Sequence, residues 1–399
     1  MKIDFERFGC IDKGSVELND FTIFCGKNNT GKTYVMYAIY CIFDIVNSMI
    51  EHSKYMNELK EYTYINRKET KLYNQENFLI KNRIQILETH IKKLLPDFFG
   101  VSNSEFLNTK IKIINNELDG ISTFSNSNFS NKKNVFLLPA ERNGINTFSK
   151  ELFSIRNILL QQAQNDSVNP MLFLKDIVNA RYPKPIKDYL QFINSIGTTQ
   201  QDNSAYSDYA QTIQTNVLGG DYLVDEFGNI SFTTHENNKN IPLHFSSSTV
   251  KSLFGLVFYL KHIAKEGDYL MIDEPELNLH PDNQHEVARI LAQLVNAGLK
   301  VVVSTHSDYF VRELNNLIML KNDFAGADAL KQKYNYQDNE LLDSSKVSAY
   351  LFANNTIEKM PLGEEGIVAD TFNQVIHELN QSSNEIYYAM QDVKELENW

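Results

Sequence analysis

The sequence predicts an α/β protein in which a mixed, largely parallel sheet is flanked by helices and interrupted by helical insertions. A short apolar run at 21–25 leads into the glycine-rich stretch 26–33, and the following residues 34–50 contain no Pro or Gly, which is typical of a buried helix. Two further apolar runs, at 269–272 and 301–303, are separated by a helical pattern. Strands that are apolar throughout, rather than alternating in polarity, are typical of a parallel sheet covered on both faces.

Strands and helices are both predicted before residue 134. Alternating polarity on either side of Gly14 predicts two strands ahead of the run at 21–25. The stretch from about 45 to 134 is rich in Asn, Lys and Glu, and its Ser/Asn-rich end, 122–134, predicts a loop. An amphipathic helix that ends at Pro96 is predicted by apolar residues at steps of four and three: Ile80, Ile84, Leu87, Ile91 and Leu94.

Beyond residue 134, strand and helix patterns alternate. The apolar run 135–138 predicts a buried strand that ends in a loop, and turn residues within 222–232 predict a hairpin. One helix is expected at about 249–265, and another ends before Gly298, with an apolar face made by Val287, Ile290, Leu291 and Leu294. The last elements expected are a strand near 347–352 and a helix on which four residues share a face: Phe372, Val375, Ile376 and Leu379.

These patterns suggest three parts of the chain. The sheet-forming segments would build a discontinuous head from residues 1–44, 134–146, 216–320 and 345–399. Residues 45–133 would form a helical insertion lobe. Residues 147–215, which are interrupted by prolines and a polar linker, would form a second helical segment.

The composition excludes several classes of protein. With 42% hydrophobic residues and only 9 Pro and 17 Gly among 399, the chain is neither disordered nor collagen-like. Its net charge of −12 argues against a protein that coats nucleic acid through positive charge alone. Three cysteines without a CxxC pair exclude a disulfide framework and a zinc ribbon, and no apolar stretch has the length of a signal peptide or a membrane span. We therefore expect a cytoplasmic protein that neither enters nor crosses a membrane.

The glycine-rich stretch matches the pattern GxxxxGK[ST], in which small residues let consecutive amides converge on phosphate oxygens at a helix N-terminus. Lys32 would neutralise the β- and γ-phosphate oxygens, and the Thr33 hydroxyl would bind Mg²⁺. The alternative is an ordinary glycine turn before a helix. The candidate nucleotide-binding residues are Gly26, Lys27, Asn28, Asn29, Thr30, Gly31, Lys32 and Thr33.

Polar residues with catalytic potential follow the two apolar runs of the C-terminal third. Asp273, at the end of the run 269–272, would hold Mg²⁺, and Glu274 would polarise the water that attacks the γ-phosphate. An acidic pair is also common at a solvated strand end. His306 follows the next strand and would sense the γ-phosphate from the same edge of the sheet, although a lone histidine is more often a packed or surface residue.

Three motifs together resemble the ATP-binding-cassette ATPases of the SMC, RecF and OLD group: the stretch 26–33, DEPELNLHPDNQ at Asp273–Gln284 and STHS at Ser304–Ser307. The resemblance is strongest to the small AAA-type ATPases of bacterial anti-phage and abortive-infection operons. It covers about 1–44 and 216–320. It implies a P-loop ABC-type ATPase head that uses ATP and Mg²⁺ as cofactors.

The resemblance also implies contacts from a second protomer. A D-loop would lie at Asn278–Pro281, and a signature motif would lie just before the helix at about 249. There Ser247 and Ser248, with the free amides of the helix N-terminus, would bind a γ-phosphate presented by another copy of the chain. The alternative is a plain serine N-cap. Ser or Thr stands where related proteins have glycine.

Two features of the family are missing. Such ATPases usually have a Q-loop glutamine after an early strand, but Glu141 and Arg142 occupy this position, and either a structural ion pair or a contact to Mg²⁺ or phosphate would suit them. OLD relatives can carry a TOPRIM nuclease, which needs a DxD cluster, and no DxD follows His306. We therefore expect an ATPase without a nuclease site of its own.

The leading hypothesis is an ATP-hydrolysing switch that forms homodimers or higher oligomers around nucleotide and controls a separate effector, a nuclease or toxin, in anti-phage defence. A DNA-repair ATPase of RecF or SMC type is the first alternative. Its support is the insertion 51–134, where 13 Lys and Arg against 10 Asp and Glu give a charge of +3. The second alternative is a non-hydrolysing scaffold that binds ATP to hold an effector inactive, against which the presence of Glu274 argues.

Overall fold

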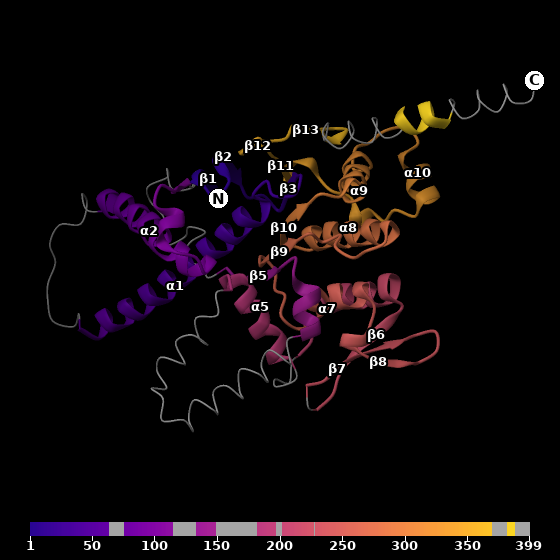
Figure 1. Ribbon diagram of the computed structural model, residues 1–399, viewed down its shortest axis with the longest axis horizontal. Helices are drawn as coiled ribbons and strands as arrows, with labels where there is room; N and C mark the ends of the chain where they lie inside the picture. The colour runs from indigo at the N-terminus through magenta and orange to yellow at the C-terminus, as the bar shows by residue number, and fades with distance from the viewer. Residues whose placement is uncertain are drawn as a thin grey trace, which may run out of the picture.

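A nine-stranded sheet runs through the centre of the molecule and separates two layers of helices (Figure 1). The strand order is β4-β1-β2-β12-β11-β3-β10-β9-β5. The sheet is mixed and its larger part is parallel, which confirms the α/β class expected from the sequence. The computed structural model describes residues 1–63, 76–114, 133–148, 182–196, 202–226, 228–368 and 381–387.

The parallel part of the sheet is made by the apolar runs of the sequence. It consists of β11 (Val347–Ala353), β3 (Phe21–Gly26), β10 (Lys300–Thr305), β9 (Tyr269–Asp273) and β5 (Val135–Leu138). All residues of β3 and β9 are buried, because helices cover both faces of the sheet at these strands. The mixed part consists of β1 (Lys2–Phe8), β2 (Ile11–Glu17), β4 (Lys110–Ile114) and β12 (Thr356–Lys359).

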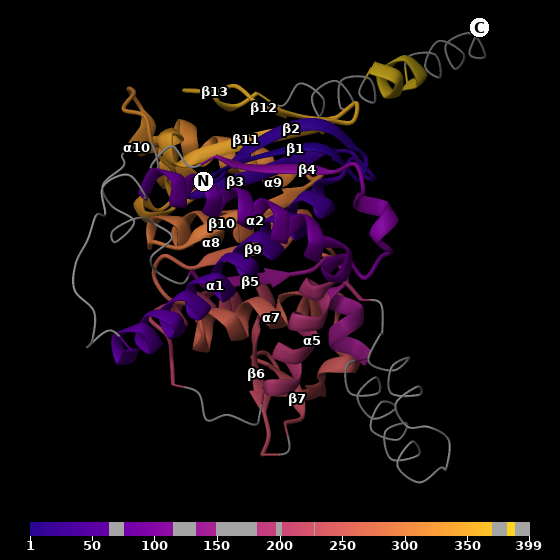
Figure 2. The ribbon, with the colours of Figure 1, turned by 90° about the vertical axis from the view of Figure 1, so that its left-hand side faces the viewer.

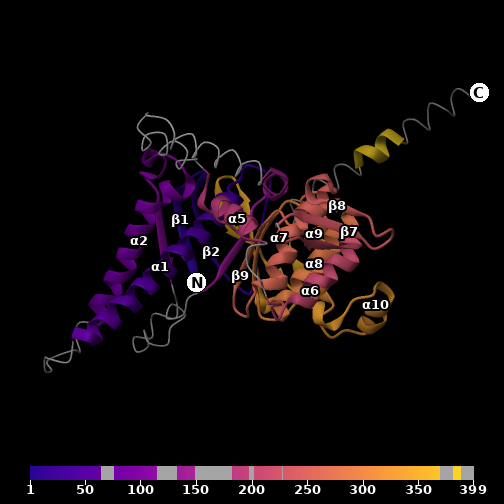
Figure 3. The same ribbon diagram turned by 90° about the horizontal axis from the view of Figure 1, so that it is seen from below.

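Long helices lie on both faces of the sheet. One face is covered by α1 (Lys32–Thr63) and α2 (Glu76–Phe99), which lie in front of the strands in Figure 2. The other face is covered by α7 (Ser248–His262), α8 (Pro281–Asn296) and α9 (Asp308–Met319), as the view along the sheet shows (Figure 3). At the β5 edge, α5 (Lys184–Ser195) packs the ring of Phe192 against Phe136. Each layer has its own apolar core.

Smaller elements surround this central sandwich. The expected hairpin forms as β6 (Gly220–Val224) and β7 (Ile230–Thr234), and β8 (Asn240–Pro242) adds a third strand. Tyr222 of this small sheet packs on Phe254 of α7 and donates a hydrogen bond from its hydroxyl to the Val250 carbonyl. The remaining elements are α6 (Ser207–Thr212), the π-helix η4 (Ile213–Leu218), α10 (Ala327–Tyr334), β13 (Leu362–Gly363), β14 (Gly366–Ile367) and the 3-10 helices η2 (Asn103–Phe106), η5 (Leu243–Phe245), η6 (Asp338–Glu340) and η7 (Ser344–Lys346).

Two expectations for the segment before residue 134 were wrong. The helix α2 does not end at Pro96 but continues to Phe99, because Pro96 removes only one late hydrogen bond while Phe98 and Phe99 are buried in the core. The strand β4 lies within 45–133, for which helices and a loop, but no strand, were expected. Its isoleucines, Ile111 and Ile113, face the core and alternate with lysines as β4 pairs with β1, so this part of the chain joins the main sheet.

Some expectations fall outside the described residues. They are the helix with Phe372, Val375, Ile376 and Leu379 and most of the loop 122–134. The side chains of Ile80 and Ile84 are likewise not described, whereas Ile91 of the same predicted stripe is fully buried. Among the described residues, no helix is both long and apolar enough to cross a membrane.

Candidate functional site

The carboxyl ends of the parallel strands bring the sequence motifs to one edge of the sheet. The strand β3 lies between β11 and β10, and β10 pairs in turn with β9. In this register Thr305 is opposite Cys25, and Ser304 is opposite Asp273. The loop 26–33 that follows β3 therefore lies beside the acidic residues after β9 and beside His306 after β10. Ligands of open α/β sheets bind at this edge.

The loop 26–33 has a backbone that only certain residues adopt. Gly26 has φ 149° and Gly31 has φ 96°, and a Cβ on Gly26 would lie 2.5 Å from the Phe352 carbonyl oxygen. Asn29 is also left-handed, with φ 62°. The helix α1 begins at Lys32, within this stretch, so the free amides of its first turn point into the loop. This is the geometry of a phosphate-binding loop rather than of an ordinary turn.

Lys32 fills the centre of this loop. Its Nζ donates hydrogen bonds of 2.8 Å to the carbonyl oxygens of Gly26 and Lys27, and the side chain is buried. Burial lowers the pKa of Lys32, while the charges of Glu274 and Asp273 act in the opposite direction. The side chains of Lys27, Asn28 and Asn29 are exposed at the mouth of the loop.

Asp273 is fully buried at the end of β9. Its carboxylate accepts a hydrogen bond from Ser304 Oγ, and the Thr33 hydroxyl lies next to it. Among the described residues, the oxygen Oδ2 has no hydrogen-bond partner. Burial raises the pKa of Asp273 to about 6. A buried carboxylate oxygen without a partner, beside a hydroxyl, fits Mg²⁺, which binds proteins through one or two carboxylates together with substrate phosphates.

Glu274 and His306 face each other across the ends of β9 and β10. His306 Nδ1 lies 3.5 Å from Glu274 Oε1, and both side chains are partly exposed. The hydrogen bond between them lowers the pKa of Glu274 and raises the pKa of His306. Glu274 is therefore ionised at neutral pH and able to accept a proton. Its backbone is left-handed, with φ 53°, which is rare for a residue other than glycine.

Glu276 is part of the site, although the sequence analysis assigned it no role. Its buried carboxylate accepts hydrogen bonds from Thr305 Oγ1 at 2.7 Å and from the His306 amide at 2.9 Å. The same oxygen lies 3.5 Å from His306 Nδ1. Glu276 therefore orients His306 toward Glu274. The only sequence signal for this role was its position two residues after Glu274.

The structure removes one of the interpretations left open for Glu141 and Arg142, the ion pair between them. The two side chains do not form an ion pair with each other among the bonds of the described residues. Glu141 accepts a hydrogen bond of 3.4 Å from Tyr37 and lies close enough to Asp273 to raise its pKa. Arg142 is buried and donates to main-chain carbonyls, including that of Asp273 at 2.7 Å. Arg142 therefore has a structural position directly behind the site.

Ser247 and Ser248 lie at the N-terminus of α7, and both are exposed. Ser247 is the N-cap, because its Oγ accepts a hydrogen bond of 3.2 Å from the Val250 amide. Thr249 donates a hydrogen bond of 3.1 Å to the Asn278 carbonyl, so the expected D-loop lies against the same helix end. The serines and the D-loop therefore share one exposed face.

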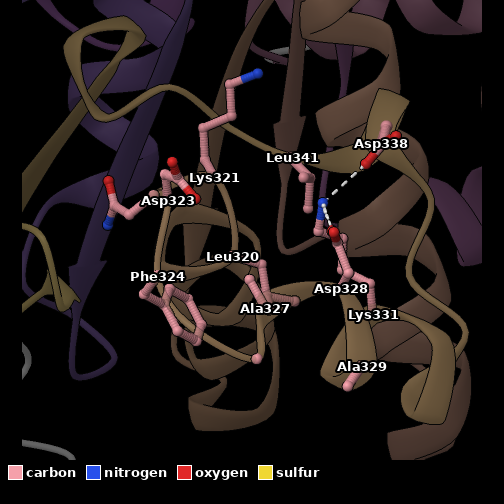
Figure 4. A pocket seen from close by; sticks show the side chains of 12 residues that line it. Leu320, Lys321, Asp323, Phe324, Ala327, Asp328, Ala329, Lys331, Asp338 and Leu341 are labelled. Atoms are coloured by element: carbon pink, nitrogen blue, oxygen red, sulfur yellow. Dashed lines mark hydrogen bonds and ion pairs between the residues drawn. The ribbon is translucent and has the colours of Figure 1, made fainter.

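A separate pocket of about 330 Å³ lies at the start of α10 and contains none of the predicted site residues. One of its two lysines, Lys331, forms ion pairs with Asp328 at 3.0 Å and Asp338 at 3.1 Å (Figure 4). Both carboxylates point at the lysine in the figure. The pocket holds none of the sequence motifs, so the sheet edge remains the candidate functional site.

A phosphate-binding loop, an acidic pair and an imidazole at the carboxyl edge of a parallel sheet define the class of P-loop nucleoside triphosphatases. The chain belongs to the AAA ATPase domain family, whose model matches residues 102–311, more than half of the chain. It is therefore an ATP-binding ATPase. The matched range includes β9 and β10, and the pairing of β3 with β10 brings the loop 26–33 to it.

Comparison with solved structures finds heads of SMC proteins at low sequence identity. An SMC head bound to the C-winged helix domain of ScpA is 11% identical, with a TM-score of 0.35 over 90% of this chain and 96% of that chain. The SMC head domain from Thermotoga maritima is 11% identical, with a TM-score of 0.34, and the match covers 91% of this chain and 98% of that chain. An SMC head with an extended coiled coil from Pyrococcus furiosus, bound to the C-terminal domain of ScpA, is 12% identical, with a TM-score of 0.35 over 95% and 98%. Comparison with curated proteins finds no match.

Proposed function

We propose that this ATPase is a cytoplasmic switch in which two copies of the chain enclose two ATP molecules, and that their closing and opening control a separate effector, a nuclease or toxin, in bacterial anti-phage defence. The observation that supports the composite site is the exposed face formed by Ser247, Ser248 and Asn278. The amides at the start of α7 are available there to bind an anion from another molecule. The defence role rests on the resemblance of the sequence motifs.

In this proposal each residue of the sheet edge has a distinct task. The amides of 26–33 and the Lys32 ammonium bind the phosphates, so that Lys32 exchanges two loop carbonyls for phosphate oxygens. Thr33 and Asp273 would hold Mg²⁺, which would supply positive charge against the phosphate oxygens. Glu274 accepts a proton from the attacking water as the bond between the γ-phosphorus and the ADP oxygen breaks. His306, oriented by Glu276, donates toward the γ-phosphate.

The arrangement of Glu274 favours hydrolysis over a scaffold that only binds ATP. A general base must be ionised and must be aimed at the reacting water. Glu274 is ionised at neutral pH, since the hydrogen bond with His306 lowers its pKa below an already acidic value, and its left-handed backbone restricts the direction of its side chain. A scaffold would have no need for this strained conformation.

The composite site is tested by placing a negative charge on the serine face. We expect wild-type protein to double its mass with ATP and Mg²⁺, and Ser248→Glu to remain monomeric and to hydrolyse ATP at least about tenfold more slowly, because a carboxylate would face the partner's γ-phosphate. A glutamate at the first position of a helix does not weaken the helix. Ser207→Glu, at the first position of α6, is therefore the matched control. Mass photometry and phosphate release measure both effects.

A Ser248→Glu protein that dimerises and turns over like wild type would show that the serines lie outside the nucleotide interface. The effector part of the proposal requires a different experiment. Purification of the chain from its native host is expected to yield a second protein in fixed ratio. Protection against phage by this chain alone would contradict that part while leaving the ATPase assignment intact.

A further inference from the structure

Arg142 is the largest fully buried side chain of the described residues, and it binds only main-chain oxygens. It stands at the start of the helical segment 142–148 that follows β5. Nη1 donates to the Asp273 carbonyl at 2.7 Å and to the Pro139 carbonyl at 3.1 Å. Nη2 donates to the Glu274 carbonyl at 2.6 Å, and Nε donates to the Ser252 carbonyl at 3.1 Å. One guanidinium therefore joins the β5 loop, the end of β9 and α7.

This bonding pattern differs from that of an arginine held in an ion pair. Arg289, on α8, pairs with the Glu313 carboxylate at 2.6 Å. Arg142 has no carboxylate within ion-pair distance among the described residues, although burial lowers its pKa. The dipoles of four carbonyls and the field of the nearby Asp273 and Glu276 offset the cost of burying its charge. Since its partners are backbone atoms, Arg142 holds main-chain positions rather than another side chain.

The first of these positions is the turn that contains the proposed base. The Glu274 amide donates to the Ser304 carbonyl at 3.0 Å, and the Glu274 carbonyl accepts from Arg142. The peptide units on both sides of this left-handed residue are thus held, one by β10 and one by Arg142. The direction of the Glu274 side chain, toward His306, depends on both.

The second position is the first part of α7, the helix that presents Ser247 and Ser248. Arg142 binds the carbonyl of Ser252, one turn after Ser248. Asn146, from the same helical segment, donates to the neighbouring Lys251 carbonyl at 2.7 Å and accepts from Tyr189 at 3.0 Å. The segment 142–148 therefore holds the serine end of α7 at two adjacent carbonyls.

We infer that Arg142 is a positioning residue that couples the base-bearing turn of one nucleotide site to the serine face that completes the other site of the dimer. The inference rests on the proposed function. A shift of Glu274 upon binding or loss of the γ-phosphate moves the Arg142 fork and, with it, the N-terminus of α7. In the reverse direction, engagement of the serine face by a second copy fixes Glu274 in its hydrolytic position.

The test separates positioning from folding. We expect Arg142→Gln to lower kcat at least about thirtyfold while the Kd of a non-hydrolysable ATP analogue changes less than about threefold, because the hydrogen bonds of Arg142 go to main-chain carbonyls outside the loop 26–33. Arg142→Lys keeps the positive charge but loses the planar set of N–H donors, and its kcat should lie between those of wild type and Arg142→Gln. Arg289→Gln is the matched control: it removes a half-buried arginine from an ion pair and should lower the thermal midpoint but not kcat.

Coupling is measured by combining the Arg142 and Ser248 variants. Arg142→Gln with Ser248→Glu should lower kcat much less than the product of the single effects, whereas Arg289→Gln with Ser248→Glu should give that product. Equal losses of kcat and analogue affinity, or multiplicative effects in the Arg142 pair, would overturn the inference. If Arg142→Gln does not fold, Arg142→Lys decides by the same measurements. A wild type as inactive as Lys32→Ala would instead refute the proposed ATPase mechanism itself.

Discussion

Replacement of Glu274 by glutamine is expected to lower ATP turnover by about 100-fold to 10,000-fold, the usual contribution of a general base. Glutamine keeps the size of the side chain but cannot accept a proton from water. ATP binding should persist, because Lys32, Thr33 and Asp273 are unchanged. The nucleotide-bound dimer should therefore accumulate, since the step that dissolves it is blocked.

The measurement compares kcat at saturating ATP and Mg²⁺ with mass in solution, for wild type and Glu274→Gln. The matched control is Glu340→Gln, which changes a buried carboxylate at the far side of α8, where Glu340 binds Gln293 and the Gln337 amide. Its kcat should stay within about twofold of wild type. A Glu274→Gln protein that turns over ATP normally would show that another group activates the water, and the assignment of the base would be wrong.

Asp273→Asn is expected to abolish Mg²⁺-dependent turnover, by about 100-fold or more, and at the same time to stabilise the nucleotide-free protein. Burial raises the pKa of Asp273 from 3.8 to about 6. Ionisation of the buried Asp273 carboxyl group destabilises the folded protein, because its folded-state pKa lies above its unfolded-state pKa. This loss of stability is absent below about pH 4, grows as the pH rises through 6 and is complete at pH 8. Two pKa units correspond to about 3 kcal/mol, which is an upper limit for the gain in the free energy of unfolding.

Denaturation at pH 4, 6 and 8 without nucleotide or Mg²⁺ measures this gain. Asp268→Asn is the control, because Asp268 precedes β9 at the opposite edge of the sheet and its pKa is also raised by burial. Asp268→Asn should also raise the free energy of unfolding and should leave ATP turnover unchanged. If Asp273→Asn were less stable than wild type at pH 8, the carboxylate would contribute net stabilisation and would not be held ionised at a cost.

The local sequence was sufficient for the parallel core and for the position of the site. The apolar runs at 21–25, 269–272 and 301–303 became buried parallel strands, and 26–33 became a phosphate-binding loop at the start of a helix. These features could be predicted because their signals are short in range: hydrophobic runs, turn residues and a glycine spacing that only one backbone path satisfies.

Contacts between distant segments could not be predicted from the sequence. The strand β4 is stabilised by pairing with β1, about a hundred residues away, and the alternation of lysine and isoleucine at 110–113 is too short to mark it against its helical surroundings. Glu276 accepts a hydrogen bond from the His306 amide only because β9 and β10 pair in one register. Arg142 took its role only when four carbonyls from three segments converged on it. Motifs follow from the residues of one segment, whereas these positions follow from long-range packing, which a single segment does not encode.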